Sequence, residues 1–284
     1  MPPTPPMPQR PGAPAEKMPI RGVKNLVAVA SGKGGVGKTT CAVNLALALS
    51  RMGAAVGLLD ADVYGPNVPI MLGTEEQPQA ISEREILPVI VYGLKVISMG
   101  LLVPGDKPMI WRGPMLHSVM QQFLRSVVWG ELDYLIIDLP PGTGDVQLSL
   151  VQTVPLTGAV VVTTPSTVAL ADVRKAIEMF RQVNVEVLGI IENMSYFKCP
   201  HCDNRVDVFG HDQGRRVAEA YGIPLLGEIE LDPRIRIGGD TGKPVASLGD
   251  QAPGAASIYA AARAVAARVA EVSAAGTGPR VEIV

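Results

Sequence analysis

The residues best suited to chemistry form a single run, Gly32 to Thr40, which reads Gly-Lys-Gly-Gly-Val-Gly-Lys-Thr-Thr. The run matches the pattern G-x-x-x-x-G-K-[ST], whose glycines let backbone N–H groups surround a polyphosphate at the start of a helix. In that pattern Lys38 reaches the β- and γ-phosphates and the Thr39 hydroxyl ligates Mg²⁺. An apolar strand predicted over residues 25–30 precedes the run, and an Ala- and Leu-rich helix predicted over 39–51 follows it. Because a chance glycine-rich turn would lack this context, the sequence predicts a nucleoside triphosphate site.

Lys33 adds a second positive charge to this loop, one residue after its first glycine. The loop backbone occupies the side that faces its own nucleotide. We therefore expect Lys33 to reach the nucleotide of a facing subunit, as an arginine finger does in trans. The arrangement resembles the deviant Walker A loop of the family that includes the nitrogenase iron protein and the cell-division site-selection ATPases. That resemblance implies a dimer, and the alternative is a solvated surface lysine.

Aspartates follow two of the predicted apolar strands. Asp60 and Asp62 come at the end of the strand predicted over 55–60, where a carboxylate faces the phosphates. We expect Asp62 to orient the attacking water and Asp60 to support the Mg²⁺ shell, and the alternative is a pair of aspartates that cap a turn. Asp138 closes the strand predicted over 134–138, which is the Walker B arrangement that holds Mg²⁺ through water. The predicted Mg²⁺ residues are Thr39, Asp60 and Asp138, and the predicted catalytic residues are Lys33, Lys38 and Asp62.

Two further segments fit a nucleotide site. The run at 140–144, Pro-Pro-Gly-Thr-Gly, is stiff at one end and permissive at the other, so we expect it to contact the γ-phosphate and rearrange on its loss. Asn193 closes a later strand and is expected to hydrogen-bond the purine. The chain contains no Asn-Lys-x-Asp guanine motif, which favours ATP over GTP. The predicted nucleotide-binding residues are Gly32, Lys33, Gly34, Gly35, Val36, Gly37, Lys38, Thr39, Thr40 and Asn193.

The elements that must position these residues alternate between strands and helices. Strands are predicted over 25–30, 55–60, 87–91, 94–98, 134–138, 159–164, 185–192 and 225–229, and helices over 39–51, 114–128, 168–182 and 255–272. Such alternation indicates an α/β P-loop NTPase with a mostly parallel sheet and helices on both faces. We expect one ATPase domain over 20–274, a disordered Pro-rich tail over 1–19 and a loose tail over 275–284.

Composition excludes several classes of function. With a net charge of −2 in 284 residues, bulk electrostatics gives no sign of a nucleic-acid partner. The absence of an apolar run of about 18 residues predicts that no helix crosses a membrane. The first 19 residues lack the apolar centre of a signal peptide, and three cysteines make no disulfide framework. We therefore expect a cytoplasmic protein.

Cys199 and Cys202 place two thiols three residues apart in a predicted turn, so both sulfurs can face one metal ion or cluster. Two ligands complete neither a tetrahedral zinc site nor an iron–sulfur cluster, and Cys41 is expected to be buried in the helix after the loop. Two chains related by a two-fold axis supply four thiolates. The alternatives are zinc completed by His201 or His211, and a redox C-x-x-C.

Taken together, several runs resemble the Mrp/ApbC family of iron–sulfur cluster carrier ATPases over residues 23–270. These runs are 32–40, 62–67, 110–115, 138–145, 193–195 with Cys199 and Cys202, and 231–240. The resemblance implies a cytosolic homodimer that binds ATP and a bridging 4Fe–4S cluster and passes the cluster to apo-proteins. The chain departs from relatives that carry a small domain before the loop or an N-terminal four-cysteine cluster. It also has Asp203 where relatives often have glycine.

Three rival functions remain at this point. A membrane-positioning ATPase of the cell-division type needs a basic amphipathic C-terminal helix, and the predicted helix over 255–272 is Ala-rich with only Arg263 and Arg268 as basic residues. An ATP-gated electron-transfer protein like the nitrogenase iron protein shares the bridging-cluster principle but takes its cysteines from two distant segments. A zinc-bridged dimer that only binds nucleotide is the third.

Overall fold

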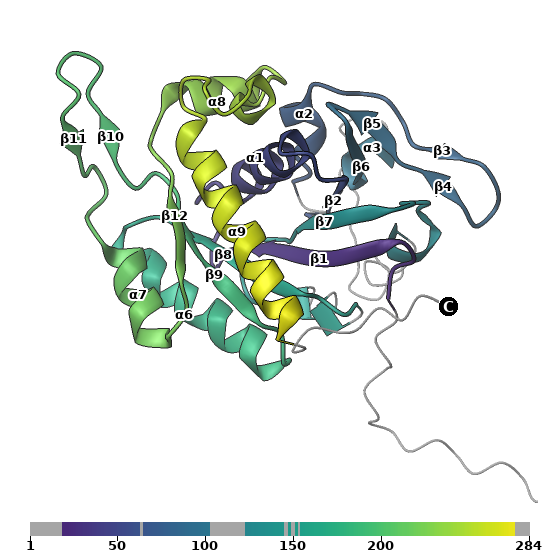
Figure 1. The fold of residues 1–284 in the computed structure, drawn as a ribbon, viewed down its shortest axis with the longest axis horizontal. Coiled ribbons are helices and arrows are strands. Elements are labelled where there is room, and N and C mark those ends of the chain that lie inside the picture. The colour runs from purple at the N-terminus through teal and green to yellow at the C-terminus, as the bar shows by residue number, and fades with distance from the viewer. Residues whose placement is uncertain are drawn as a thin grey trace, which may run out of the picture.

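A computed structural model describes residues 19–62, 65–102, 123–144, 147–148, 151–152 and 154–275. In this part of the chain, the central sheet has eight strands in the order β12-β9-β8-β1-β7-β2-β6-β5 (Figure 1). All neighbouring strands are parallel except β5, which runs antiparallel to β6. The strands are β1 (Val23–Ala30), β2 (Val56–Asp60), β5 (Val89–Val91), β6 (Leu94–Ser98), β7 (Leu132–Asp138), β8 (Gly158–Thr163), β9 (Val187–Glu192) and β12 (Leu225–Glu228).

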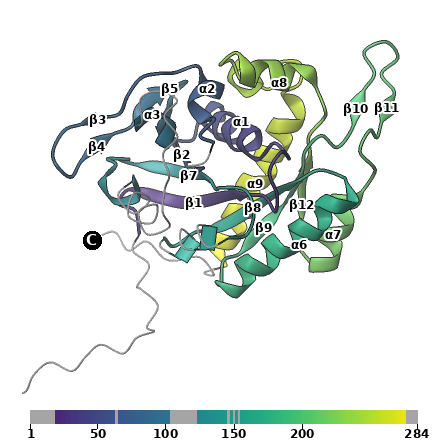
Figure 2. The same cartoon turned by 180° about the vertical axis from the view of Figure 1, so that it is seen from behind.

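Helices cover both faces of this sheet (Figures 1 and 2). On one face, Val27 and Val29 of β1 pack in a core with residues of α1 (Lys38–Arg51), α2 (Val68–Leu72), α8 (Pro233–Asp240) and α9 (Ala256–Ala274). On the other face, the alternate residues Leu26, Ala28 and Ala30 pack with α6 (Thr167–Gln182) and α7 (Gln213–Tyr221). Strands buried on both faces are continuously apolar, which is why short Val-, Leu- and Ile-rich runs predicted them. The predicted fold class is confirmed.

Most predicted elements agree with the structure to within two residues. The strand predicted over 87–91 begins two residues later, as β5, because Pro88 has no N–H for a ladder and separates β4 (Ile86–Leu87) from β5. The helix predicted over 114–128 lies mostly outside the described residues, although residues 123–126 are helical. Both predicted tails lie almost wholly outside them as well. The sequence interpretation missed the helices α2, α7 and α8.

The remaining described elements are short. They are β3 (Gln79–Ala80), which pairs with β4, α3 (Met99–Leu102), the 3₁₀ helix η1 (Val245–Leu248), and the strands β10 (Phe197–Lys198) and β11 (Arg205–Val206). Strands β10 and β11 form an antiparallel hairpin that projects from the body beside α7 and β12 (Figures 1 and 2). No described helix is long and apolar enough to cross a membrane.

Candidate functional site

The phosphate-binding loop connects the end of β1 to the start of α1, at the carboxyl edge of the sheet. Gly35 and Gly37 have φ angles of 79° and 80°, a left-handed conformation that glycine adopts at low cost. A Cβ atom at Gly37 would lie 2.2 Å from the side-chain nitrogen of Asn193, so space as well as conformation requires glycine there. The loop therefore has the glycine-dependent shape that the sequence pattern predicted.

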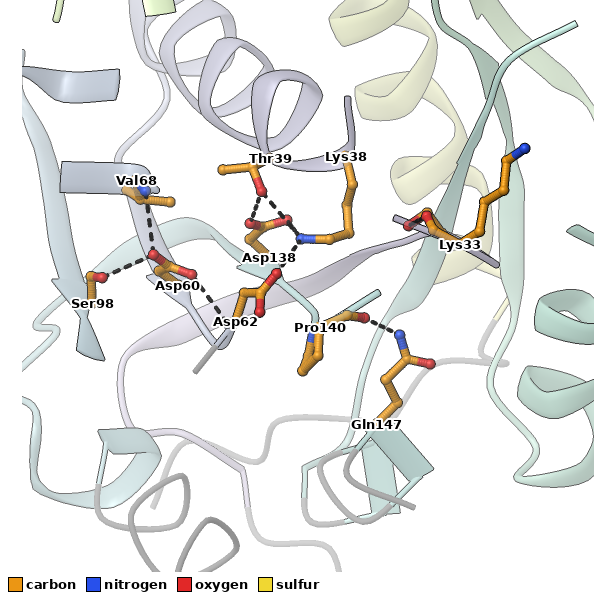
Figure 3. Close-up of polar contacts among 11 residues, drawn as sticks. Lys33, Lys38, Thr39, Asp60, Asp62, Val68, Ser98, Asp138, Pro140 and Gln147 are labelled. Atoms are coloured by element: carbon orange, nitrogen blue, oxygen red, sulfur yellow. Dashed lines mark hydrogen bonds and ion pairs between the residues drawn. The ribbon is translucent and has the colours of Figure 1, made fainter. Parts of the chain in front are cut away.

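The lysine that ends this loop is buried and paired with acidic groups. Lys38 Nζ lies 2.6 Å from Asp138 Oδ1 and 3.8 Å from Asp62 Oδ2, and its side chain is 6% exposed (Figure 3). The Thr39 hydroxyl donates to Asp138 Oδ2 at 2.7 Å. Burial raises the pKa of Asp138, and the neighbouring Lys38 opposes the rise. The structure thus brings Lys38, Thr39, Asp62 and Asp138 into one polar cluster at the helix N-terminus.

Asp60 lies beside this cluster, because β2 and β7 pair in a register that sets it opposite Asp138. Its carboxylate is fully buried and accepts three hydrogen bonds, from the Ser98 hydroxyl at 2.9 Å and from the N–H groups of Asp62 at 3.1 Å and Val68 at 3.3 Å. Burial, followed by the charge of Asp138, raises the pKa of Asp60 to about 7. In this arrangement Asp60 fixes the start of the segment that carries Asp62, while Asp62 itself faces Lys38.

Lys33 does not join the cluster. Figure 3 shows its side chain directed away from Lys38 and Asp138, and it is half-exposed. The predicted γ-phosphate segment lies on this side of the loop, where the Gly142 N–H donates to Ser31 O at 3.0 Å. A side chain that the sequence interpretation missed, the buried Gln147, donates through Nε2 to the carbonyl of Pro140 (Figure 3). The segment is therefore hydrogen-bonded at its start and at its glycine turn.

A cleft of about 430 Å³ opens above the loop. Asn193 lines it, and its Nδ2 donates to Val36 O at 2.9 Å, so this strand-end amide holds the loop. The other wall comes from Glu230 and Leu231 in the segment before α8 and from Ile235 of α8, to which the sequence interpretation gave no role. A local signal for this helix exists, because Asp232 caps it and is followed by proline at the first helical position.

Cys199 and Cys202 lie where the β10–β11 hairpin turns, as predicted. The Cys199 N–H donates to Asn204 O at 3.0 Å and the Asp203 N–H donates to Cys199 O at 2.9 Å, which closes the turn. Hydrogen bonds from the backbone of His201 and then of Cys202 lower the pKa of Cys199. Asp203 has a φ of 58°, the left-handed conformation that glycine adopts most readily and that aspartate adopts at a modest cost.

The described residues of one chain offer this turn only two thiols. Within them, no group of three or more His, Cys, Asp and Glu side chains could hold a metal ion. His211 lies 2.8 Å from Asp212 and 3.3 Å from Asp207, in contacts of its own. Cys41 is buried in α1 as predicted, and burial raises its pKa to about 12. A four-thiolate site at this turn thus needs a second source of thiols.

A strand, a glycine loop and a helix with a buried lysine, together with acidic strand ends on a parallel sheet, define a P-loop NTPase. A family model described as "ParA: NUBPL iron-transfer P-loop NTPase" matches residues 22–266. The chain belongs to this family, as the sequence resemblance indicated.

Relatives and solved structures agree with this assignment. The chain is 52% identical over 252 residues to an iron-sulfur cluster carrier protein from Synechocystis, covering 87% of this chain and 71% of that protein. It is 54% identical over 228 residues to a protein of the same name from Aquifex aeolicus, covering 80% of this chain and 63% of that one. A nucleotide-binding protein from Archaeoglobus fulgidus, solved in complex with ADP, is 40% identical with a TM-score of 0.71, and the match covers 79% of this chain and 88% of that one.

Proposed function

We propose that this protein binds and hydrolyses ATP and carries a 4Fe–4S cluster that is bridged between two copies of the chain and delivered to apo-proteins. The observation that carries the proposal is an exposed C-x-x-C turn with two thiols, on the same chain as a nucleotide cleft. The family match, and the carrier names of relatives at 52% and 54% identity, support it. The lack of a disulfide framework fits a reducing cytoplasm.

In the nucleotide cleft, the loop from Gly32 to Thr40 surrounds the phosphates with backbone N–H groups. Lys38 exchanges its contacts with Asp138 and Asp62 for phosphate oxygens, in charge-assisted hydrogen bonds. Mg²⁺, when bound, neutralises charge on the phosphates, and the Thr39 hydroxyl and the Asp138 carboxylate are the residues that hold it. Asn193 lines the cleft and is the residue assigned to hydrogen-bond the purine.

Hydrolysis depends on side chains inside the cluster and on one outside it. Asp62 orients the attacking water, and Asp60 supports the Mg²⁺ shell by fixing the segment that leads to Asp62. Lys33, which is directed away from its own cluster, enters the cleft of the facing copy and stabilises the charge that develops on the phosphates (Figure 3). Asp62, Glu230, Asp232 and Asp240 are carboxylates that line the described cleft, and of these Asp62 contacts Lys38. A carboxylate paired with a cation is a weak general base, so we expect slow turnover.

In this proposal the cluster is carried and then transferred, and the chemistry and exposure of the cysteine turn suit both steps. A lowered pKa at Cys199 favours the thiolate that ligates iron, and exposure of the turn leaves a path for transfer to an acceptor. Two thiolates from each of two copies complete the four that a 4Fe–4S cluster takes.

The experiment is purification and reconstitution without oxygen, followed by iron, zinc and sulfide assays and absorption at about 400 nm. We expect one 4Fe–4S cluster for every two chains, a dimer whose association weakens when the cluster is removed, and transfer to an apo-acceptor. One cluster per monomer would contradict the bridged site, and uptake of zinc alone would favour the zinc-bridged dimer. A stable cluster that only exchanges electrons in response to ATP would favour the electron-transfer alternative.

A further inference from the structure

The cysteine hairpin is attached at its base to the wall of the nucleotide cleft. The Ser195 N–H donates to Ile229 O at 2.9 Å, and the Leu231 N–H donates to Tyr196 O at 2.7 Å. Leu231 lines the cleft, and so does Asn193, two residues before Ser195. The strand-like segment that leaves β12 therefore borders the hairpin on one side and enters the cleft with its next residues.

One side chain on the hairpin reinforces this attachment. Arg205 of β11 donates through Nε to Asp207 Oδ1 at 2.8 Å and through Nη1 to Glu228 Oε2 at 3.2 Å. Its guanidinium also lies over the ring of Tyr196, 4.4 Å from the ring centre. Arg205 pairs across the hairpin with Lys198, the residue that precedes the first cysteine of the turn. It thus contacts the base of the hairpin, the residue that follows its own strand and the last residue of β12.

A guanidinium is suited to this position because its planar edge donates to two carboxylates while its face stacks on a ring. A single exposed ion pair would hold the hairpin weakly. Here the three contacts share one ordered side chain, and Glu228 is also 3.6 Å from Arg215 Nη2 of α7. The turn is tied to the same strand, since the Cys199 N–H donates to the carbonyl of Asn204, next to Arg205.

We propose that Arg205 is a positioning residue that sets the orientation of the Cys199–Cys202 turn relative to the nucleotide cleft. Through its contacts with Glu228 and Tyr196, occupancy of the cleft changes the accessibility of the two thiols. This inference deepens the proposed function, because it assigns the step that links nucleotide to cargo. Its test needs no bound cluster and can fail while the proposed function holds.

The test uses the full chain without a cluster and measures the alkylation rate of each hairpin cysteine by mass spectrometry, with and without ADP or a non-hydrolysable ATP analogue. In the wild type we expect saturating nucleotide to change the rate by about threefold or more. For each cysteine, the ratio of interest is the larger of the rates with and without nucleotide divided by the smaller. In Arg205→Ala we expect this ratio to fall to about one, with nucleotide affinity unchanged. A merely structural loosening would raise the rate with and without nucleotide and leave the ratio intact. Arg263→Ala, at an exposed arginine on α9, is the matched control and should keep the wild-type ratio.

Arg205→Lys keeps the charge but not the planar fork, and it replaces Arg205→Ala if that variant does not fold. We expect its ratio to fall toward one as well. Rates that do not respond to nucleotide in the wild type, or a folded Arg205 variant that keeps the wild-type ratio, would overturn the proposal. If the wild type responds to nucleotide and the Arg205 variant does not, but the wild type binds no cluster, the result would count against the carrier function alone.

Discussion

At the nucleotide cleft, the side chains of Lys38 and Asp138 are 6% and 0% exposed and contact one another directly, whereas Cys202 at the tip of the hairpin is exposed. The cleft is built on the ends of long strands inside the sheet, and the cysteine turn on two strands of two residues each. A buried, preorganised site strengthens electrostatic contacts and excludes water, which suits phosphate chemistry. An exposed turn suits a ligand that must leave, and the predictions below test this contrast.

The largest effect is expected at the buried lysine. Lys38→Ala removes the charge aimed at the phosphates, and we expect ATP hydrolysis to fall by about 10²-fold or more, with nucleotide binding weakened in a direct titration. Lys24→Ala, at an exposed lysine near the other end of β1, is the control and should leave the rate unchanged. An unchanged hydrolysis rate in Lys38→Ala would remove the basis for the nucleotide site.

On the hairpin, Cys199→Ser or Cys202→Ser should each lose iron and the absorption at about 400 nm while the fold is kept. Each single change removes one thiolate from each of two chains, so it should be nearly as damaging as the double change. Cys41→Ser is the matched control and should retain the cluster, since that thiol is buried in α1. ATP hydrolysis should fall less than cluster transfer does, because the thiols do not touch the phosphates. A full loss of hydrolysis in the hairpin variants would break the separation of the two sites.

Lys33 tests whether the cleft is complete in one chain. Lys33→Ala should leave ATP binding intact and lower hydrolysis by about 10- to 10³-fold, because its charge acts in the transition state of the facing site. Mixing Lys33→Ala chains with Lys38→Ala chains should restore activity. Mixing Lys33→Ala chains with chains that carry both substitutions should not. Mixed dimers no more active than their parents would place Lys33 in its own site or outside catalysis.

The pH dependence of alkylation should differ between Cys199 in the hairpin turn and Cys41 in α1. The backbone hydrogen bonds at the turn lower the pKa of Cys199 below its ordinary 9.0, and burial raises the pKa of Cys41 to about 12. Because the thiolate is the nucleophile, alkylation of Cys199 should reach its half-maximal rate below pH 9, whereas Cys41 should stay unlabelled until the protein unfolds. Equal labelling of the two thiols in the native protein at about pH 8 would contradict this contrast.

The smallest effect is expected from the strained backbone of the turn. Asp203 adopts a left-handed φ of 58°, which costs a non-glycine residue about 1 kcal/mol. Asp203→Gly and Asp203→Ala both lose the contact with Lys198, so we expect the glycine variant to be more stable than the alanine variant by about 1 kcal/mol in urea unfolding. Equal stability of the two variants would show that the turn relaxes to another conformation.

Local patterns in the sequence determined a large share of this protein. The glycine loop, its strand and its helix are contiguous, so loop geometry and apolar periodicity predicted them together. The strands around them are buried on both faces, which made them readable as short apolar runs and indicated the parallel sheet. The pair of cysteines three residues apart predicted a two-thiol turn. Even the later start of the strand predicted over 87–91 has a local cause in Pro88.

Tertiary structure alone decided how distant residues meet. Lys38 and Asp138 are 100 residues apart in sequence, and Asn193 is 157 residues from the Val36 carbonyl that it binds. Asp60 accepts from Ser98 because β2 and β6 are neighbours, and it accepts from the Val68 N–H at the start of α2. A pattern of strand-end aspartates does not predict either contact. Strand order and helix packing fix such contacts, and they depend on the whole core.

The same reason applies to the cleft wall and the hairpin. Residues of α8 line the cleft because α8 packs in one core with α1 and α2. Arg205 contacts Tyr196 and Glu228 because β11 folds back on β10, in a hairpin whose base is hydrogen-bonded to the segment that leaves β12. In sequence these are an ordinary helix cap and an ordinary surface arginine. The sequence determined which chemical groups the protein has and their local geometry, and the packing of the sheet decided which of them act together.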